Sequence, residues 1–237
     1  MPFGDAGETR IRWGIPDAVV AWIAGLVVSI PASVGLAPGE PIGPVRTTAA
    51  VVLQNVGIVA ALWLISRFKG QDSLVRDFGF PRADWFTPGV VAAWLALGVA
   101  GSIVVNLALL PIQRLGHLDQ NAQDVARTVR HAHGPALAGL FLAIVVVAPL
   151  VEELLFRGVL LRALQRRFTT SVAIVGSALV FAAAHILGGA DAYAVVPGLF
   201  LLGIASGVTA VRSGNLTRSV LLHAGFNLLS AVLLVRA

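Results

Sequence analysis

Residues 136–161 read ALAGLFLAIVVVAPLVEELLFRGVLL, an apolar stretch that carries two adjacent glutamates, Glu152 and Glu153. The whole chain has only two other glutamates, Glu8 and Glu40. The stretch is long enough to cross a bilayer, which takes about 20 apolar residues in a helix. A charged side chain inside such a helix is costly and usually faces a polar interior with partners of its own. The stretch therefore predicts a membrane helix that carries a functional site.

Composition places the rest of the chain in the membrane as well. Of 237 residues, 57% are hydrophobic and 12% are charged, about half the charged fraction of a typical soluble domain. We expect a cytoplasmic N-terminal segment, residues 1–16, followed by a single membrane domain, residues 17–237. The absence of cysteine excludes disulfides, thiolate metal sites and a cysteine nucleophile.

The distribution of apolar segments predicts an all-α fold, a polytopic membrane helix bundle of about seven transmembrane helices with the active site inside the bundle. The connection 111–135 is polar enough to form a surface helix ahead of the fourth span. The predicted spans are residues 17–37, 46–66, 88–110, 136–161, 171–187, 193–211 and 216–235.

Lysine and arginine in the connections predict the orientation. With the N-terminus inside, the inner connections hold most of these cations, and positive residues favour the cytoplasmic side. We therefore expect a multi-pass protein of the plasma membrane with a cytoplasmic N-terminus. In such a protein the surplus of arginine indicates cytoplasmic loops, so we expect no nucleic-acid partner.

The two glutamates differ in their predicted surroundings. Glu153 and Arg157 are four residues apart and share a helix face, so they can form an ion pair. Glu152 is rotated about 100° from Glu153 and has no partner of this kind in its own helix. Pro149 precedes the pair by one turn, where a proline frees a backbone carbonyl and bends the helix. Such a bend often lines a wet cavity.

Two later spans carry further polar groups. Phe181 and His185 are one turn apart in the fifth predicted span, and His223 and Asn227 are one turn apart in the seventh. These side chains can meet Glu152 only if the three helices surround one cavity. Counting about 1.5 Å per residue, Glu152 lies near mid-depth, His185 lies further out and His223 lies nearer the cytoplasm. Each group taken alone is equally compatible with interhelical hydrogen bonding.

The order EExxxR, FxxxH and HxxxN resembles the CPBP family of CAAX proteases and bacteriocin-processing (Abi) enzymes, which includes the type II CAAX prenyl endopeptidase. The matching residues lie in a motif-bearing core, residues 136–235. The resemblance implies an intramembrane endopeptidase whose catalytic residues are Glu152, His185, His223 and Asn227. In this family Glu152 would activate water and Asn227 would help to hold the tetrahedral intermediate. Glu153, Arg157 and Phe181 would support the site.

A metal ion is the main alternative in the mechanism. Two histidines and a glutamate, here His185, His223 and Glu152, are a set that catalytic zinc can use with one position open for water. We favour a mechanism without a metal or other cofactor, because the chain has no HExxH on one helix and the ligands would come from three helices. The zinc-dependent version of the same protease stays open at this point.

Other classes of function make different predictions. A proton-coupled transporter would use intramembrane glutamate and histidine as a relay, but would also show repeated halves, which the sequence lacks. A non-catalytic membrane scaffold would tolerate loss of Glu152. For the protease, we expect the partners to be the lipid bilayer and a peptide or protein substrate, whether lipidated or embedded in the membrane. The sequence leaves the choice among these substrates open.

Overall fold

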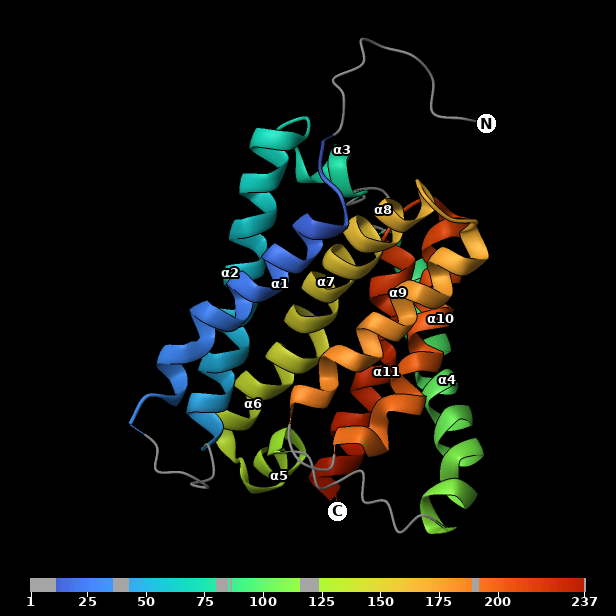
Figure 1. Ribbon diagram of the computed structural model, residues 1–237. Coiled ribbons are helices and arrows are strands. Elements are labelled where there is room, and N and C mark those ends of the chain that lie inside the picture. Colours follow the sequence, from blue (N-terminus) through green and yellow to red (C-terminus); the bar gives the residue numbers. More distant parts are fainter. Residues whose placement is uncertain are drawn as a thin grey trace.

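The computed structural model describes residues 12–35, 43–79, 85, 87–115, 124–188 and 192–236. Within these ranges the chain forms helices, turns and loops and contains no strand. Figure 1 shows that the long helices run side by side between two ends of the molecule. The predicted all-α membrane bundle is therefore confirmed.

Six apolar segments in the described part of the chain are long enough to span a membrane, and a seventh apolar helix is shorter. The long segments are α1 (Ile15–Ser29) with η1 (Ile30–Ser33), α2 (Pro44–Lys69), α4 (Pro88–Leu115), the composite segment Gly134–Gln165, α10 (Val196–Ser213) and α11 (Thr217–Arg236). The shorter helix is α9 (Thr170–Ala184), which the 3-10 helix η6 (His185–Gly188) follows. All seven correspond in place to predicted spans.

Short helices occupy the two ends of the bundle. At one end lies α3 (Leu74–Phe78), and η7 (Ala192–Val195) leads into α10 at the other. The predicted surface helix in the polar connection is present as α5 (Asp124–His131). Its Val129 is buried against Leu140 and so attaches the helix to the fourth span.

Prolines mark where the spans begin. Pro44 and Pro88 are the first residues of α2 and α4, and Pro16 and Pro197 stand within the first two positions of α1 and α10. Proline suits these positions because the first N–H groups of a helix have no partner within the helix. Gly214, with φ at +68°, ends α10 and allows the turn into α11.

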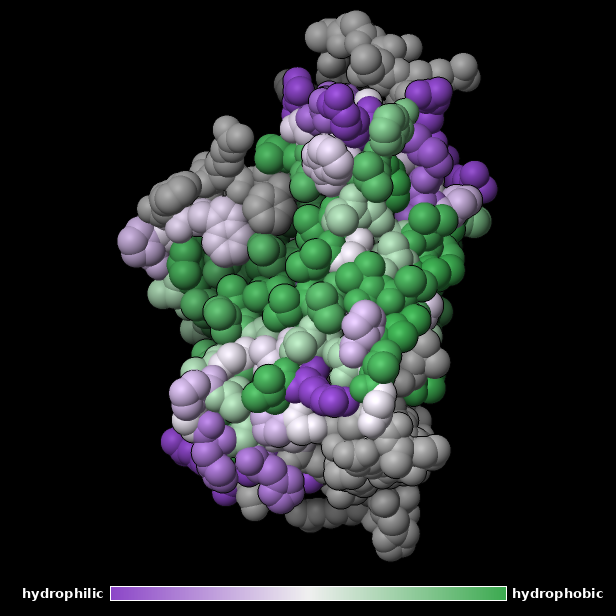
Figure 2. Space-filling view, turned by 90° about the vertical axis from the view of Figure 1, so that its left-hand side faces the viewer, coloured by the Kyte–Doolittle hydropathy of each residue, from purple (hydrophilic) through white to green (hydrophobic). Residues whose placement is uncertain are grey.

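The middle of the molecule is covered by apolar side chains. Figure 2 shows a broad hydrophobic band on one face, with hydrophilic residues gathered toward both ends. Exposed side chains such as Val19, Leu107 and Leu179 belong to helices that span this band. A surface of this kind is stable in lipid, where apolar side chains lose nothing by exposure. The protein is a multi-pass membrane protein.

Glycines allow the closest helix contact, which is between α4 and α11. A Cβ atom added to Gly98 would lie 2.0 Å from the carbonyl oxygen of Leu222, and one added to Gly225 would lie 2.2 Å from that of Leu95. Small residues commonly mark helix contacts in membranes because they let two backbones approach. The contact fixes the part of α11 that contains His223.

We expect Gly98→Ala to destabilise the protein by at least about 2 kcal/mol, because the new methyl group meets backbone that cannot move aside. Gly101 provides a matched control on the same helix, since a Cβ there meets nothing within 4 Å. Gly101→Ala should leave stability unchanged or raise it by up to about 1 kcal/mol, the helix-propensity difference. Unfolding temperatures in one detergent compare the two, and equal values would contradict the contact.

Candidate active site

The glutamates lie on a span that is not a regular α-helix. The composite segment runs through α6 (Gly134–Leu142), the π-helix η4 (Ala143–Val147), α7 (Ala148–Glu153), the π-helix η5 (Leu154–Leu161) and α8 (Arg162–Gln165). Both glutamates thus stand in a short α-helical stretch between two π-helical stretches. π-Helical stretches are rare and often occur at functional sites. The predicted irregularity near Pro149 is present here as η4.

Pro149 also explains a contact between this span and α11. At the end of η4 the N–H of Ala148 donates to the carbonyl of Ala143, five residues back. In that register the carbonyl of Ile144 would pair with residue 149, which as a proline has no N–H to donate. Instead, Asn227 Nδ2 on α11 donates to Ile144 O at 3.0 Å. One hydrogen of the Asn227 amide therefore holds η4 in place.

Glu153 is fully buried and paired. Its Oε1 lies 3.1 Å from Nη1 of Arg157, and both side chains have 0% exposure. Arg157 Nη2 also donates to the carbonyl of Gly203 on α10 at 3.1 Å. The predicted ion pair is confirmed, and it joins the fourth span to α10. A buried charge without such partners would be strongly destabilising.

His223 lies between the two glutamates. Its Nδ1 is 3.0 Å from Glu153 Oε1, and its Nε2 is 3.7 Å from Glu152 Oε2. A carboxylate can only accept, so we assign a proton to Nδ1, which donates to Glu153, while Nε2 faces Glu152 without a direct hydrogen bond. Glu152 has 23% of its side chain exposed, so unlike Glu153 it can meet a ligand.

Phe181 of α9 connects the two histidines. Its ring is fully buried, with its centroid 4.9 Å from that of His185 and 5.5 Å from that of His223, both edge to face. The guanidinium of Arg157 lies over the same ring, 4.6 Å from its centroid. His185 Nδ1 lies 2.9 Å from the carbonyl of Phe181, so this nitrogen donates and Nε2 is left as an acceptor. The two histidines therefore face one shared aromatic ring.

Glu153 and His223 lie at similar depths, although sequence counting placed the site residues at different depths. Gly158 and Leu216 are level, since a Cβ on Gly158 would lie 3.3 Å from Leu216 Cδ1. Glu153 and His223 are five and seven residues further into the bundle, about 7 and 10 Å along their helices. The counting misled because it took the inner ends of the spans as level, whereas Leu216 lies beside a residue three positions before the predicted end of the fourth span. Asn227 lies one turn beyond His223, where its amide contacts Ile144 O.

Sequence reasoning missed two features of the site. It did not predict the hydrogen bond between His223 and Glu153, although an imidazole ring has two nitrogens and can contact both adjacent glutamates. It also missed the carbonyls of Ile144 and Gly203, since backbone acceptors leave no mark in a side-chain pattern. Only Pro149, five residues after Ile144, indicates one of them.

The zinc alternative concerns Glu152, His185 and His223. Among the residues that the structure describes, no group of three histidine, aspartate or glutamate side chains lies close enough to hold a metal ion. Nδ1 of His185 and Nδ1 of His223 are engaged with Phe181 O and Glu153 Oε1, which leaves Nε2 of each ring. Metal-ligating histidines commonly make such contacts through their second nitrogen, so these two hydrogen bonds fit either mechanism.

Comparison with known proteins finds a family similarity in the same part of the chain. Residues 134–229 match the family model described as type II CAAX prenyl endopeptidase Rce1-like. The chain is also similar to an uncharacterized 24.3 kDa protein of Escherichia coli, with 28% identity over 151 residues. That match covers 63% of this chain and 61% of the relative. No solved structure matches the chain.

The family match contains all three motifs. Residues 152 to 227 lie within the matched range, so the glutamates, both histidines and the asparagine fall inside it. The first three spans lie outside it. The match confirms, over residues 134–229, the resemblance to the CPBP family that the motifs indicate.

Proposed function

We propose that the protein is an intramembrane endopeptidase in which Glu152 activates a water molecule for hydrolysis of a peptide bond. The Rce1-like match of residues 134–229 supports a CAAX-type endopeptidase in general. The observation that carries the mechanism is the placement of His223 between a buried, paired glutamate and a partly exposed one. In this arrangement Glu152 is the base that can reach water, and Glu153 is the group that holds His223 in place.

Glu152 is the general base in this mechanism. It takes a proton from the attacking water and can pass that proton to the leaving amine, as a base positioned at a reacting group does. The separation of 3.7 Å from His223 Nε2 is too long for a strong direct hydrogen bond, so both groups keep capacity for water or substrate. Neutral His185 has Nε2 as an acceptor and can orient the same water.

Asn227 and His223 supply donors to the oxyanion. The Asn227 amide has two hydrogens, and the bond to Ile144 O uses one of them. If His223 gains a proton at Nε2, it becomes an imidazolium beside Glu152 and Glu153, which stabilise that charge, and it can donate to the tetrahedral intermediate. Donors aimed at the developing negative charge commonly provide a large share of catalysis.

The substrate is a peptide or protein, and the bilayer gives access to one that is lipidated or embedded. The test is cleavage of reporter peptides by the full chain in detergent. One peptide ends in a prenylated CAAX sequence, and its match lacks the prenyl group. Cleavage of either establishes the endopeptidase. Preference for the prenylated form supports the CAAX type, and no cleavage of these or of membrane-embedded reporters would contradict the proposal.

Removal of metal is expected to leave this activity within about twofold of its starting value, because the proposed proton transfers need only protein groups. The measurement is the cleavage rate of protein dialysed against chelator and assayed in metal-free buffer. Chelator presaturated with zinc controls for binding of the chelator itself. Loss of activity that added zinc restores would favour the zinc-dependent version of the same protease.

A further inference from the structure

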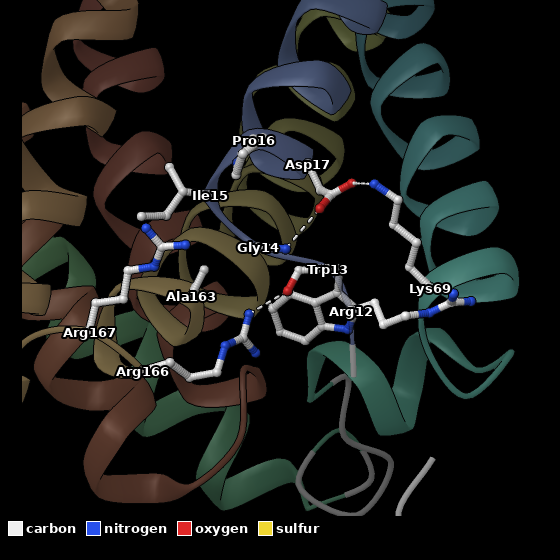
Figure 3. A pocket seen from close by; sticks show the side chains of 10 residues that line it. All are labelled: Arg12, Trp13, Gly14, Ile15, Pro16, Asp17, Lys69, Ala163, Arg166 and Arg167. Carbon is white, nitrogen blue, oxygen red and sulfur yellow. Dashed lines mark hydrogen bonds and ion pairs between the residues drawn. The ribbon is translucent and has the colours of Figure 1, made fainter. Parts of the chain in front are cut away.

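A cavity lies far from the glutamates, at the end of the bundle where α1 begins. Its volume is about 350 Å³, within the range of small-molecule pockets. Its walls come from the residues before and at the start of α1, from the end of α2 and from the segment after α8 (Figure 3). Arg166 follows Glu152 by 14 residues, so about 20 Å of helix separates the cavity from the candidate active site.

Positive charge dominates the lining. Four cations, Arg12, Lys69, Arg166 and Arg167, line the cavity together with one carboxylate, Asp17. Asp17 is already engaged: Lys69 Nζ lies 2.6 Å from its Oδ1, and the N–H of Gly14 donates to its Oδ2 at 2.8 Å. The lysine is therefore neutralised by the only acidic side chain of the lining, and the three arginines are not.

Two of the arginine side chains have neutral partners. Arg12 Nη2 donates to the carbonyl of Phe68 at 2.9 Å, and Arg166 Nη2 donates to that of Trp13 at 2.5 Å. Within the described residues the guanidinium of Arg167 has no hydrogen bond or ion pair. A guanidinium has five N–H donors, so each arginine keeps several for a ligand. Burial, followed by the adjacent Arg167 cation, lowers the pKa of Arg166.

Trp13 adds an unused neutral donor. Its side chain is only 3% exposed, and its Nε1 is buried without a hydrogen-bond partner. The ring is held by Phe78 at a centroid distance of 5.3 Å and by the Arg166 guanidinium 4.3 Å above it. A buried N–H without a partner is costly, and such groups call for an explanation such as a bound ligand. Figure 3 shows Trp13 between the Arg12 and Arg166 sides of the cavity.

We propose that this cavity binds a phosphate group, carried by the headgroup of an anionic phospholipid. Planar guanidinium groups match phosphate oxygens in geometry and charge. The lining also lies where three spans leave the hydrocarbon, at the start of α1, at Lys69 and just after Gln165, which is the level of lipid headgroups. Basic pockets between membrane helices bind such headgroups in this way. Free phosphate has the same chemistry, and the experiment distinguishes the two sources.

The test measures the unfolding temperature of the full chain in detergent against increasing ligand, since a ligand that binds the folded state raises it. Short-chain phosphatidylglycerol is compared with phosphatidylcholine of equal chain length and with inorganic phosphate. We expect the anionic lipid to bind at least fivefold more tightly than the choline lipid, roughly the effect of one cation. Competition by inorganic phosphate would show that a phosphate group alone is enough for binding in the cavity. If inorganic phosphate does not compete, the cavity recognises the phosphate only as part of a lipid headgroup.

Two variants test the residues. Arg167→Gln should weaken the anionic lipid roughly fivefold, while Arg212→Gln, an exposed arginine of α10 outside the lining, should not. Trp13→Phe removes the unpartnered N–H but also shrinks a buried side chain, so it should weaken binding and lower the unfolding temperature of the unliganded protein, and the lipid-induced rise is measured from that lower value. Equal affinity for the two lipids, or equal losses in Arg167→Gln and Arg212→Gln, would overturn the proposal.

Discussion

Glu152→Gln is expected to lower kcat/KM for peptide cleavage by about 1000-fold or more while leaving the unfolding temperature unchanged. The substitution preserves size and removes the basic oxygen that accepts the proton of water, and general base catalysis is worth about 10²–10⁴ in rate. Stability should not change, because Glu152 is partly exposed and its contact to His223 is 3.7 Å long. Cleavage rates and unfolding temperatures of the same preparation measure both effects.

Asp72→Asn provides the control for charge removal. Asp72 is an exposed carboxylate that pairs with Arg67 at 2.7 Å, far from the site in sequence. The Asp72→Asn variant should keep the full cleavage activity of the wild-type protein. If Glu152→Gln retained more than about a tenth of the wild-type rate, Glu152 would not be the base, since even a weak base contribution exceeds that factor.

Glu153→Ala is expected to destabilise the protein by about 3–5 kcal/mol, the usual cost of leaving one member of a buried ion pair alone. Arg157 would keep its bond to Gly203 O but lose its counter-charge, and His223 would lose the acceptor on Nδ1. Removal of the charge from an exposed pair, Asp72→Asn, should cost at most about 1 kcal/mol, and asparagine tolerates the positive φ of this position. Unfolding temperatures in one detergent compare the two pairs.

A double variant separates stability from positioning. Glu153→Leu with Arg157→Met removes both charges and should recover most of the lost stability, since well-packed apolar residues often replace a buried pair without cost. It should stay inactive because nothing then orients His223. Equal destabilisation by Glu153→Ala and Asp72→Asn, or an active double variant, would refute the role assigned to Glu153.

The sequence predicts the spans well because hydrocarbon thickness imposes a length that apolar runs must meet. It also predicts the Glu153 and Arg157 pair, which depends only on helical spacing. Other features depend on how helices pack. The two contacts of His223 require α11 to lie against α7, and the shared ring of Phe181 requires α9 to lie beside both. The basic cavity joins Arg12 to Arg166 and Arg167, which are more than 150 residues apart.

The irregular backbone was only partly predictable. Pro149 predicts a break in hydrogen bonding, but not that the chain would form a π-helix there or that Asn227 would donate to Ile144 O. The continuation of the fourth span through α8 was not predicted either, because Arg162 was assigned to a connection. The depth error has another cause: Leu216 at the start of α11 lies beside Gly158, so the inner ends of the two spans are not level.

Cleavage of a reporter peptide in water enriched in ¹⁸O tests the central claim most directly. If Glu152 activates water, the wild-type protein releases a fragment whose new carboxyl group carries one solvent oxygen, as mass spectrometry of the products would show. The Glu152→Gln variant, with the same unfolding temperature as the wild-type protein, should release no labelled fragment above background. Equal labelled product from wild type and Glu152→Gln, or cleavage without solvent oxygen in the product, would contradict the account.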